Sequence, residues 1–354
     1  MIFTYIVYNS ILLFSFLFSY IAEYCKNKKL SIIFLSGSFF IIFFIAAIRY
    51  NIGTDYKNYV EIFKNLNTSD QYLELSFLFI SSTIKSNGLD VQWLFVVFSF
   101  ISLLFIYITA FNYNKVLFII SFILILYLQN LSAIRQICAI CISFYAIHKL
   151  MNNRSMSFVL WILISSTFHS STLILLPFAL LKKIRCNNFL FFIITLIISV
   201  LIFQFDLASK ILSIEFISQT KYANYINGKF SSETKLGSGF GVILKVIYPF
   251  IILLFTMNRK DKSKNYIFTF MMMYIISIFL SAKIHIFNRI PPIFSVIIPF
   301  SVCYVYNIRT KYKQLIIFSF ISIYLFLYEV DINISQSSLN SGLGISPYTT
   351  IFEK

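Results

Sequence analysis

The sequence predicts an all-α protein, a polytopic transmembrane helical bundle of about 12 spans. Hydrophobic residues make up 59% of the chain and charged residues 12%. The apolar residues come in uninterrupted blocks, most of them roughly 15 to 23 residues long, which is the length that a helix needs to cross a bilayer core. A transmembrane β-barrel would instead show alternating segments of about 10 residues, and the sequence has no such pattern.

The sequence divides into twelve apolar segments that are candidate spans. We expect them at 2–22, 30–48, 91–111, 115–130, 133–150, 155–168, 170–181, 188–205, 240–257, 265–282, 291–307 and 314–329. The first segment has no basic leader before it and no small-residue cleavage site after it, so we interpret it as a retained span. The short pair 155–168 and 170–181, broken by Pro177, fits either two spans or a re-entrant hairpin.

Basic residues occur in short clusters between the apolar segments, a pattern that sets the orientation of membrane proteins. One alternating topology places every cluster on the cytoplasmic side and both termini outside. In this topology the inside segments carry a net charge of about +14 and the outside segments about +2. Orientation therefore explains the net charge of +16, and we expect no nucleic-acid partner. The clusters are Lys26/Lys28/Lys29, Lys115, Lys149/Arg154, Lys182/Lys183/Arg185, Arg259/Lys260/Lys262/Lys264 and Arg309/Lys311/Lys313.

Four polar stretches lie outside in this topology, at 49–90, 206–239, 283–290 and 330–354. Within the first, charged residues surround a short apolar run, which predicts an amphipathic helix at 72–90 on the outer surface. We find no soluble domain or fixed repeat and interpret residues 1–354 as one integral-membrane domain. The glycine-rich stretch before the span at 240–257 lacks the strand and helix of a nucleotide loop, and metal-ligand spacings are missing. We therefore expect neither a cofactor nor a metal.

A dense polar segment directly follows the second span. Gly53 in this segment lets the backbone turn or approach a ligand closely. An ordinary structural explanation is a helix end with a snorkelling Arg49 and a capping Thr54 or Asp55. Polar groups at the point where a membrane helix emerges also suit chemistry. The candidate site residues of this segment are Arg49, Asn51, Gly53, Thr54, Asp55 and Tyr59.

Cationic residues at the outer face predict an anion site. Arg135 lies in a long apolar stretch that is otherwise free of charge, and an arginine in a membrane needs an anionic partner or a water-filled cavity. Arg289 stands at the outer end of a later span, close to Lys283. We expect these residues to converge with Arg49 on one anion. Guanidinium groups make paired hydrogen bonds to phosphate oxygens, so a lipid pyrophosphate is the natural candidate.

His169 lies among serine and threonine residues at the junction of two short apolar segments. A neutral imidazole can take a proton from a hydroxyl, so His169 is a candidate general base beside Asp55. A histidine that is hydrogen-bonded by its neighbours is an equally good explanation. Tyr222 and Tyr225, in the longest polar loop, are candidates for stacking on sugar rings, although most aromatic residues belong to the core or the interfacial belt.

The segment 47–56, with Tyr59 and Phe63, resembles a signature of the EpsG-like, Wzy-type polysaccharide polymerases. That signature, R-x-x-x-G-x-D-x-x-x-Y, follows the second span. Further matches appear in the same order along the chain and at the same predicted face, so the resemblance runs over most of the sequence. These matches are Ile134-Arg135-Gln136 with Ala139, Phe168-His169 with Ser171, and Arg289 before a span.

The resemblance implies polymerisation of lipid-linked oligosaccharide repeat units on the outer face of the bacterial cytoplasmic (inner) membrane, for O-antigen, capsule or exopolysaccharide. It implies a flippase and a chain-length regulator as partners. Arg49, Arg135 and Arg289 would hold the undecaprenyl pyrophosphate, whose departure positive charge assists. His169 or Asp55 would accept the proton of the acceptor hydroxyl. The substrate-binding residues would be Asn51, Gly53, Thr54, Tyr59, Gln136, Tyr222 and Tyr225.

Two other functions fit a cationic membrane cavity. A flippase for lipid-linked oligosaccharides would line a path through the midplane with charges and would be built from paired halves. In this sequence the charged candidates gather at one face, which favours an enzyme. A membrane O-acyltransferase using His169 on a sugar hydroxyl would need a route for an acyl donor.

Overall fold

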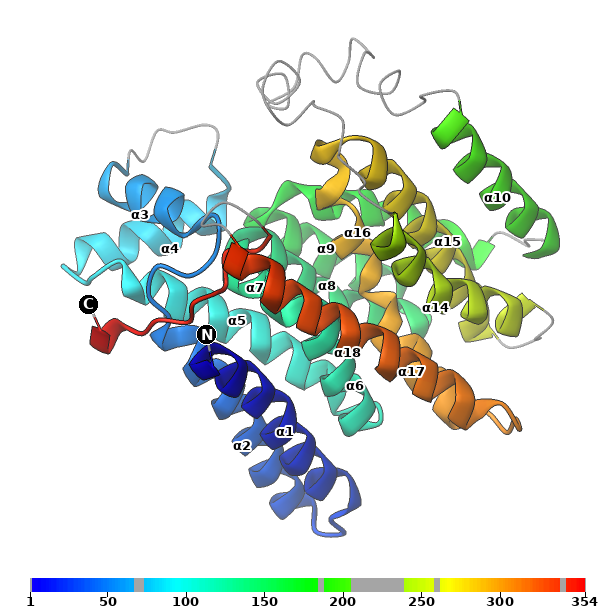
Figure 1. Cartoon of the computed structure of the whole chain (residues 1–354), viewed down its shortest axis with the longest axis horizontal. Helices are drawn as coiled ribbons and strands as arrows, with labels where there is room; N and C mark the ends of the chain where they lie inside the picture. Colours follow the sequence, from blue (N-terminus) through cyan, green and yellow to red (C-terminus); the bar gives the residue numbers. More distant parts are fainter. Residues whose placement is uncertain are drawn as a thin grey trace.

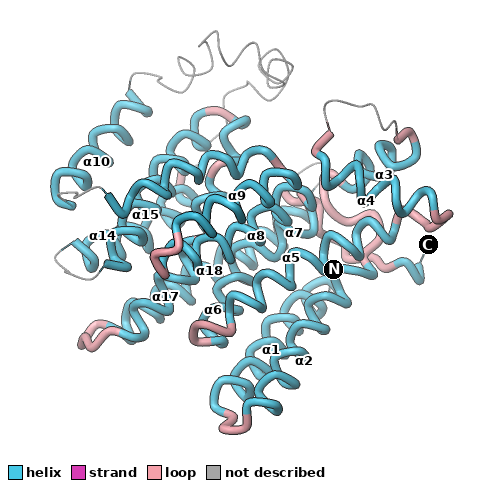
Figure 2. Tube along the Cα trace, turned by 180° about the vertical axis from the view of Figure 1, so that it is seen from behind, coloured by secondary structure: helices cyan, strands magenta, loops and turns pink. Residues whose placement is uncertain are grey.

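The computed structural model describes residues 2–66, 73–183, 188–204, 239–257, 262–337 and 342–353. Over these ranges the chain is helical and contains no strand, apart from an isolated bridge between Arg49 and Thr350. Figure 1 shows the helices as a bundle, and Figure 2 shows the same bundle from behind with its described loops in pink. The prediction of an all-α polytopic membrane protein is confirmed.

The helices follow the predicted apolar segments closely. Each of the twelve candidate spans coincides with a helix or with a short series of helices. The elements of the bundle are α1 (Ile2–Tyr24), α2 (Lys28–Ile48), α5 (Gln92–Ala110), α6 (Lys115–Phe122), η1 (Ile123–Tyr127), α7 (Leu128–Ser132), α8 (Ile134–Met151), α9 (Ser155–Phe168), η2 (Ser170–Lys183), α10 (Asn188–Gln204), α14 (Phe240–Met257), α15 (Lys262–Lys283), η4 (His285–Arg289), α16 (Pro291–Ser295), α17 (Ile297–Asn307) and α18 (Lys313–Ser337).

Nine helical stretches of the described chain are long and apolar enough to cross a membrane. Three of the twelve predicted spans fall short of that length, namely those that form α9, η2 and α10. Helix α9 ends at Phe168, and His169 takes an extended conformation before η2 begins. Both α9 and η2 pack on α8. The break in this pair therefore lies at His169, the junction that the sequence indicates, whereas Pro177, which was expected to break the pair, lies inside η2.

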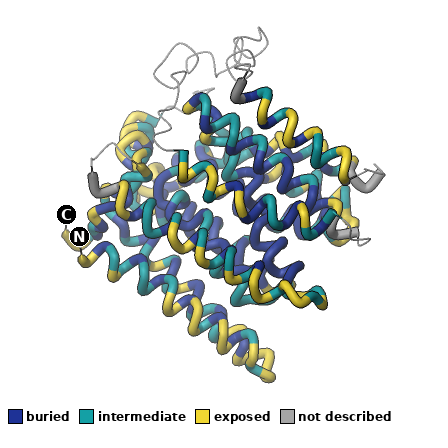
Figure 3. Tube along the Cα trace, turned by 45° about the vertical axis from the view of Figure 1, so that its right-hand side comes forward, coloured by how far each residue is buried: buried dark blue, intermediate teal, exposed yellow. Residues whose placement is uncertain are grey.

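Helix α8 forms the centre of the bundle. It contacts α5, α7, α9, η2 and α16, and its apolar residues face all directions, which is typical of a buried helix. In contrast, α1, α14 and α18 expose much of their surface, as expected for helices that face lipid. Figure 3 shows this gradient, with buried residues gathered in the middle and exposed ones on the outermost helices.

Residues predicted on the same side of the membrane meet at the same end of the bundle. At one end, the carboxylate of Glu23 accepts hydrogen bonds from the backbone and side-chain nitrogens of Lys115, at 3.0 and 3.1 Å. At the other end lie both chain termini and the helices α3 (Tyr56–Lys64) and α4 (Leu75–Ser86) (Figure 1). We call it the α3–α4 end. Helix α4 coincides with the amphipathic helix predicted at 72–90.

The C-terminal segment 342–353 folds back over the polar segment that follows α2. Tyr50 N donates to Thr349 O at 3.0 Å, and Gly53 N donates to Gly344 O at 2.8 Å. The hydroxyl of Tyr348 donates to the carbonyl of Ile45 near the end of α2. Because these backbone bonds join residues about 300 positions apart, the polar segment 49–55 has a fixed course over the α3–α4 end.

Candidate active site at the α3–α4 end

A cavity of about 260 Å³ opens at the α3–α4 end and gathers most of the predicted site residues. We call it the arginine cavity. It is bounded by the start of α3, by the junction of α7 with α8, by His169 and by η4 with the start of α16. Its polar lining residues are Thr54, Asp55, Tyr59, Gln129, Ser132, Arg135, Gln136, His169, His285, Asn288 and Arg289.

Arg135 lies in the first turn of α8 and has the anionic partner that its place in an apolar stretch requires. Its Nη1 donates to Glu74 Oε2 at 2.8 Å, and the side chains of Arg135 and Glu74 are 21% and 9% exposed. The guanidinium also lies over the rings of Tyr59 and Phe77, with centroid distances of 5.5 and 5.0 Å. These contacts hold the charge in one place at the cavity wall.

Arg289 is brought to the cavity by η4, a short 3-10 helix between α15 and α16. The side chain of Gln136 donates to the backbone carbonyl of Arg289 at 2.6 Å and so ties α8 to this turn. Pro291 and Pro292 begin α16, where their missing N–H groups cost no helical hydrogen bond. The two arginines thus reach one cavity from elements more than 150 residues apart in sequence.

Asp55 lines the same cavity as these two cations and interacts electrostatically with both. Burial raises the pKa of the Asp55 carboxyl above its ordinary value, and the positive charges of Arg289 and Arg135 oppose that rise. Burial also raises the pKa of Tyr59 to about 12, so its hydroxyl stays protonated at neutral pH. The cavity therefore offers a carboxylate with increased proton affinity beside two permanent positive charges.

The backbone before Asp55 approaches the α7–α8 junction closely. Gly53 has a φ of +100°, and a Cβ atom at this position would lie 2.4 Å from the carbonyl oxygen of Leu131. Thr54 N and Oγ1 both hydrogen-bond to the hydroxyl of Ser132, at 3.1 and 2.7 Å. Gly53 thus contributes through backbone geometry, because the close approach that it permits carries Thr54 and Asp55 into the cavity.

His169 lines the same cavity, and its Nδ1 is engaged by Ser171. The backbone N–H of Ser171 donates to Nδ1 at 3.3 Å, and the hydroxyl of Ser171 lies 2.7 Å from it. A backbone N–H can only donate a hydrogen bond, so this contact favours the neutral tautomer in which Nδ1 accepts and Nε2 carries the hydrogen. In this arrangement His169 donates a hydrogen bond, whereas a general base needs a free lone pair.

Arg49 does not reach the arginine cavity. Its side chain is fully buried and lies over Phe95, with a centroid distance of 5.1 Å. Its Nη1 donates to the carbonyl of Ala46 in its own helix and to the hydroxyl of Ser99 at 3.2 Å, while Nε and Nη2 have no hydrogen-bond partner among the described residues. Lys283 does not line the cavity either. The expected convergence of four cations is thus limited to Arg135 and Arg289.

Side chains bond the carbonyls of three residues in the last turn of α2 and that of Arg49, which directly follows the helix. Tyr348 bonds the carbonyl of Ile45, Arg49 bonds that of Ala46, and Gln92 bonds those of Ala47 and Arg49 at 2.6 and 3.0 Å. Buried helix ends need such partners. Arg49 thus has the capping and packing contacts of a structural residue.

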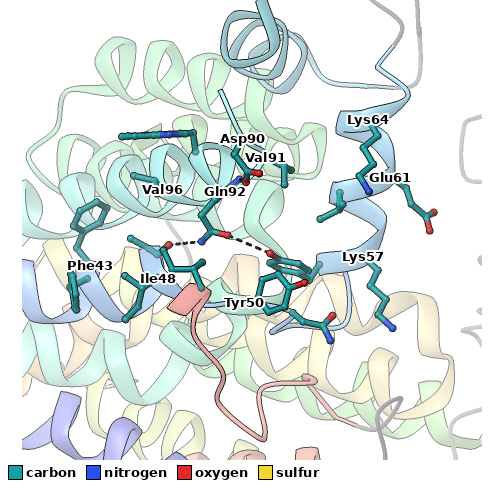
Figure 4. A pocket seen from close by; sticks show the side chains of 17 residues that line it. Phe43, Ile48, Tyr50, Lys57, Glu61, Lys64, Asp90, Val91, Gln92 and Val96 are labelled. Carbon is teal, nitrogen blue, oxygen red and sulfur yellow. Dashed lines mark hydrogen bonds between the residues drawn. The ribbon is translucent and has the colours of Figure 1, made fainter. Parts of the chain in front are cut away.

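A second opening, of about 920 Å³, lies on the other side of α3 and is shown in Figure 4. Asn51, which has a φ of +52°, lines this groove and not the arginine cavity. One part is apolar, with Phe43, Ile48 and Val96. Along α3 it carries Lys57, Glu61 and Lys64. The positive charges of the two lysines are balanced by the negative charges of Glu61 and Asp90 (Figure 4).

The remaining expectations have different outcomes. Tyr222 and Tyr225 lie outside the described residues. Among the residues that are described, histidine, cysteine and carboxylate side chains form no group of three or more that could hold a metal ion. The sequence did not identify two acidic residues as part of a site. Glu74 binds Arg135, and Asp331 lies beyond the predicted end of the last span. Helix α18 continues to Ser337 and carries Asp331 within it.

These features define a polytopic membrane protein whose polar cavity at one end is lined by a carboxylate and two arginines. Comparison with models of known protein families assigns the chain to one family. The model of the EpsG family matches residues 32–350, so the chain belongs to the EpsG family. Comparisons with curated proteins and with solved structures found no match.

Proposed function

We propose that this protein is a polysaccharide polymerase that joins undecaprenyl-pyrophosphate-linked oligosaccharide repeat units on the outer face of the bacterial cytoplasmic membrane. The observation that carries the proposal is that Asp55, Arg135 and Arg289 line one cavity and that both arginines act electrostatically on the Asp55 carboxyl. Membership of the EpsG family supports a polymerase of this kind.

The reaction is a glycosyl transfer. A hydroxyl oxygen of the acceptor repeat unit attacks the anomeric carbon of the donor, and a new C–O bond forms there. The bond from the anomeric carbon to the pyrophosphate oxygen breaks, and the lipid pyrophosphate leaves with the electron pair. The hydroxyl proton passes to the carboxylate of Asp55. Each bond that breaks is matched by one that forms, and no further reactant is required.

Arg135 and Arg289 stabilise the leaving group in this proposal. Negative charge accumulates on the pyrophosphate as the glycosidic bond breaks, and fixed guanidinium groups bind that charge more strongly in the transition state than in the substrate. The two arginines supply the positive charge without a metal ion. Because Glu74 and the rings of Tyr59 and Phe77 hold Arg135, little reorganisation is needed when the charge develops.

Asp55 suits the role of general base. Its raised pKa increases its affinity for a proton, while the neighbouring arginines favour the ionised form that must be present at the start. Tyr59, Thr54 and Gln136 supply hydroxyl and amide groups to the same cavity and would orient sugar hydroxyls. His169 contributes an N–H donor. In this proposal the α3–α4 end, with both termini, faces outward.

Deletion of the gene tests the class of function. We expect surface polysaccharide of deleted cells, separated by gel electrophoresis, to collapse from a ladder to single repeat units. A flippase would instead leave the repeat units inside the cell, and an acyltransferase would leave chain length unchanged. An Arg135→Ala variant should fail to restore the ladder. The matched control is Arg154→Ala, which removes the exposed N-cap arginine of α9, beyond the opposite end of α8, and should restore it.

A further inference from the structure

A second polar cavity adjoins the arginine cavity and is absent from the proposal so far. It has a volume of about 400 Å³, within the range of roughly 300–1,000 Å³ that small-molecule sites occupy. Asp331 and Lys245 line it, and we call it the aspartate cavity. It lies between α14, α15, η1 and α18. The two cavities lie next to each other, because they share five lining residues: Gln129, His285, Asn288, Pro292 and Leu343.

Asp331 lies in α18 and Lys245 in α14, both helices of membrane-spanning length. The two side chains interact electrostatically. Charged residues within such helices are costly and face protein or a water-filled cavity. A charge interaction that served only to join α14 to α18 would need no cavity beside it. Here both groups border a cavity that shares lining residues with the proposed reaction centre.

The lining of the aspartate cavity suits hydroxyl groups better than phosphate. A carboxylate accepts hydrogen bonds, an ammonium group donates them, and Ser281, Ser295 and Asn288 can do one or the other. The charges of Asp331 and Lys245 cancel, so the cavity lacks the excess of positive charge that favours a pyrophosphate. Tyr274 and Tyr324 also border the cavity, and both side chains are almost fully buried.

We propose that the aspartate cavity binds the sugar residues of the acceptor repeat unit and presents its hydroxyl to the donor in the arginine cavity. This inference rests on the proposed polymerase function, since it assigns the second of the two substrates. Asp331 would be a binding residue that selects sugar hydroxyls. The pyrophosphate of the donor would occupy the arginine cavity, and the two substrates would meet near the shared wall at Gln129 and Asn288.

Two binding measurements on the full-length protein in lipid nanodiscs test the assignment. One probe is undecaprenyl pyrophosphate, and the other is the fluorescently labelled, lipid-free repeat unit released from the cell's own lipid-linked precursor. We expect Asp331→Asn to weaken binding of the lipid-free repeat unit about tenfold or more and to leave binding of undecaprenyl pyrophosphate within twofold. Arg135→Ala should show the reverse. Glu329→Gln, which removes an acid from the same helix outside both cavities, should change neither.

Lys245→Gln provides a second variant, with thermal unfolding of each variant as a check of folding. The inference is overturned if Asp331→Asn and Lys245→Gln, both folded, bind the repeat unit as the native protein does. It is equally overturned if they weaken both probes alike, because that result indicates a purely structural ion pair. Failure of the polymerase function would look different: the native protein would make no polymer from lipid-linked repeat units, whatever it binds.

Discussion

Arg135 in the first turn of α8 donates a 2.8 Å hydrogen bond to Glu74, the residue that precedes α4. Glu74 fixes the direction of the guanidinium. Replacing it by glutamine removes the charge of the partner and keeps its shape. We expect Glu74→Gln to reduce polymer formation in membranes without loss of the protein, because Arg135 is no longer held in position.

A double-mutant cycle measures this coupling. We expect Arg135→Gln alone to lower the rate roughly 10²–10³-fold, as loss of a transition-state donor does. Because the two residues act as one unit, Glu74→Gln should cost little more in the Arg135→Gln background. Polymer yield from purified lipid-linked repeat units is the measurement. Additive effects would show that Glu74 contributes independently of Arg135.

The raised pKa of Asp55 predicts the acidic limb of the pH–rate profile. The carboxylate must be ionised to accept a proton, so the rate falls as the pH drops through the pKa of Asp55. Because burial raises that pKa, the fall begins at a higher pH than for an ordinary aspartate. Arg289 lowers the same pKa, so Arg289→Gln should shift the limb to still higher pH.

Asp55→Asn provides the companion measurement for this limb. We expect a loss of roughly 10²–10⁴-fold in the rate, which is the usual contribution of a general base. Binding of undecaprenyl pyrophosphate should persist. An Asp55→Asn enzyme with an unchanged acidic limb would assign the titration to another group.

Substitutions of His169 distinguish a hydrogen-bond donor from a general base. Since Nδ1 is occupied by Ser171, the ring can donate through Nε2 but has no free lone pair for the acceptor hydroxyl. Glutamine offers an N–H donor of similar reach, so His169→Gln should retain much of the activity that His169→Ala loses. If His169 were the general base, both substitutions would be equally damaging. Initial rates of polymerisation distinguish the two results, with circular dichroism as the check of folding.

Much of the architecture follows from the sequence because apolar length and charge placement are local signals. The twelve apolar segments all became helices, and residues assigned to one side of the membrane meet at one end. The number of spans did not follow from the sequence in the same way, since α9, η2 and α10 are shorter than a membrane-spanning helix. Their boundaries depend on packing against α8 and α15 and not on their own composition.

The candidate site was predictable where a charged residue stands in an apolar stretch of the sequence. Arg135 in an apolar stretch called for an anion, and the structure supplies Glu74 and a cavity. Arg49 carries the same signal at a helix end, yet its partners come from Ser99 and from a C-terminal segment about 300 residues away. Asp331 was hidden because α18 continues past its last apolar run. Contacts between distant segments decide such cases.

The family resemblance implies that Arg49 binds the pyrophosphate, whereas the structure gives Arg49 the contacts of a structural residue. Because it is fully buried and bonds the carbonyl of Ala46, we expect Arg49→Met to act on stability. A buried carbonyl without its partner costs roughly 1–3 kcal/mol. Thermal unfolding should shift to lower temperature, while the folded fraction binds undecaprenyl pyrophosphate normally. Unchanged unfolding with lost binding would instead assign Arg49 to the substrate.

Gly53 and Gly88 form a matched pair for testing how the α3–α4 end is built. Both have positive φ, +100° and +66°, so alanine is strained at either position. At Gly88 a Cβ atom would meet no atom within 4 Å, whereas at Gly53 it would lie 2.4 Å from the carbonyl oxygen of Leu131. Gly88→Ala should therefore cost about 1–2 kcal/mol of backbone strain and leave activity intact.

Gly53→Ala must in addition push the segment 52–55 away from the α7–α8 junction. That movement breaks the hydrogen bonds of Thr54 to Ser132 and withdraws Asp55 from the arginines. We expect a larger fall in unfolding temperature than for Gly88→Ala and a loss of polymerisation even at temperatures where the variant is folded. Equal effects of the two substitutions would mean that positive φ alone matters and that the close approach to Leu131 does not position the carboxylate.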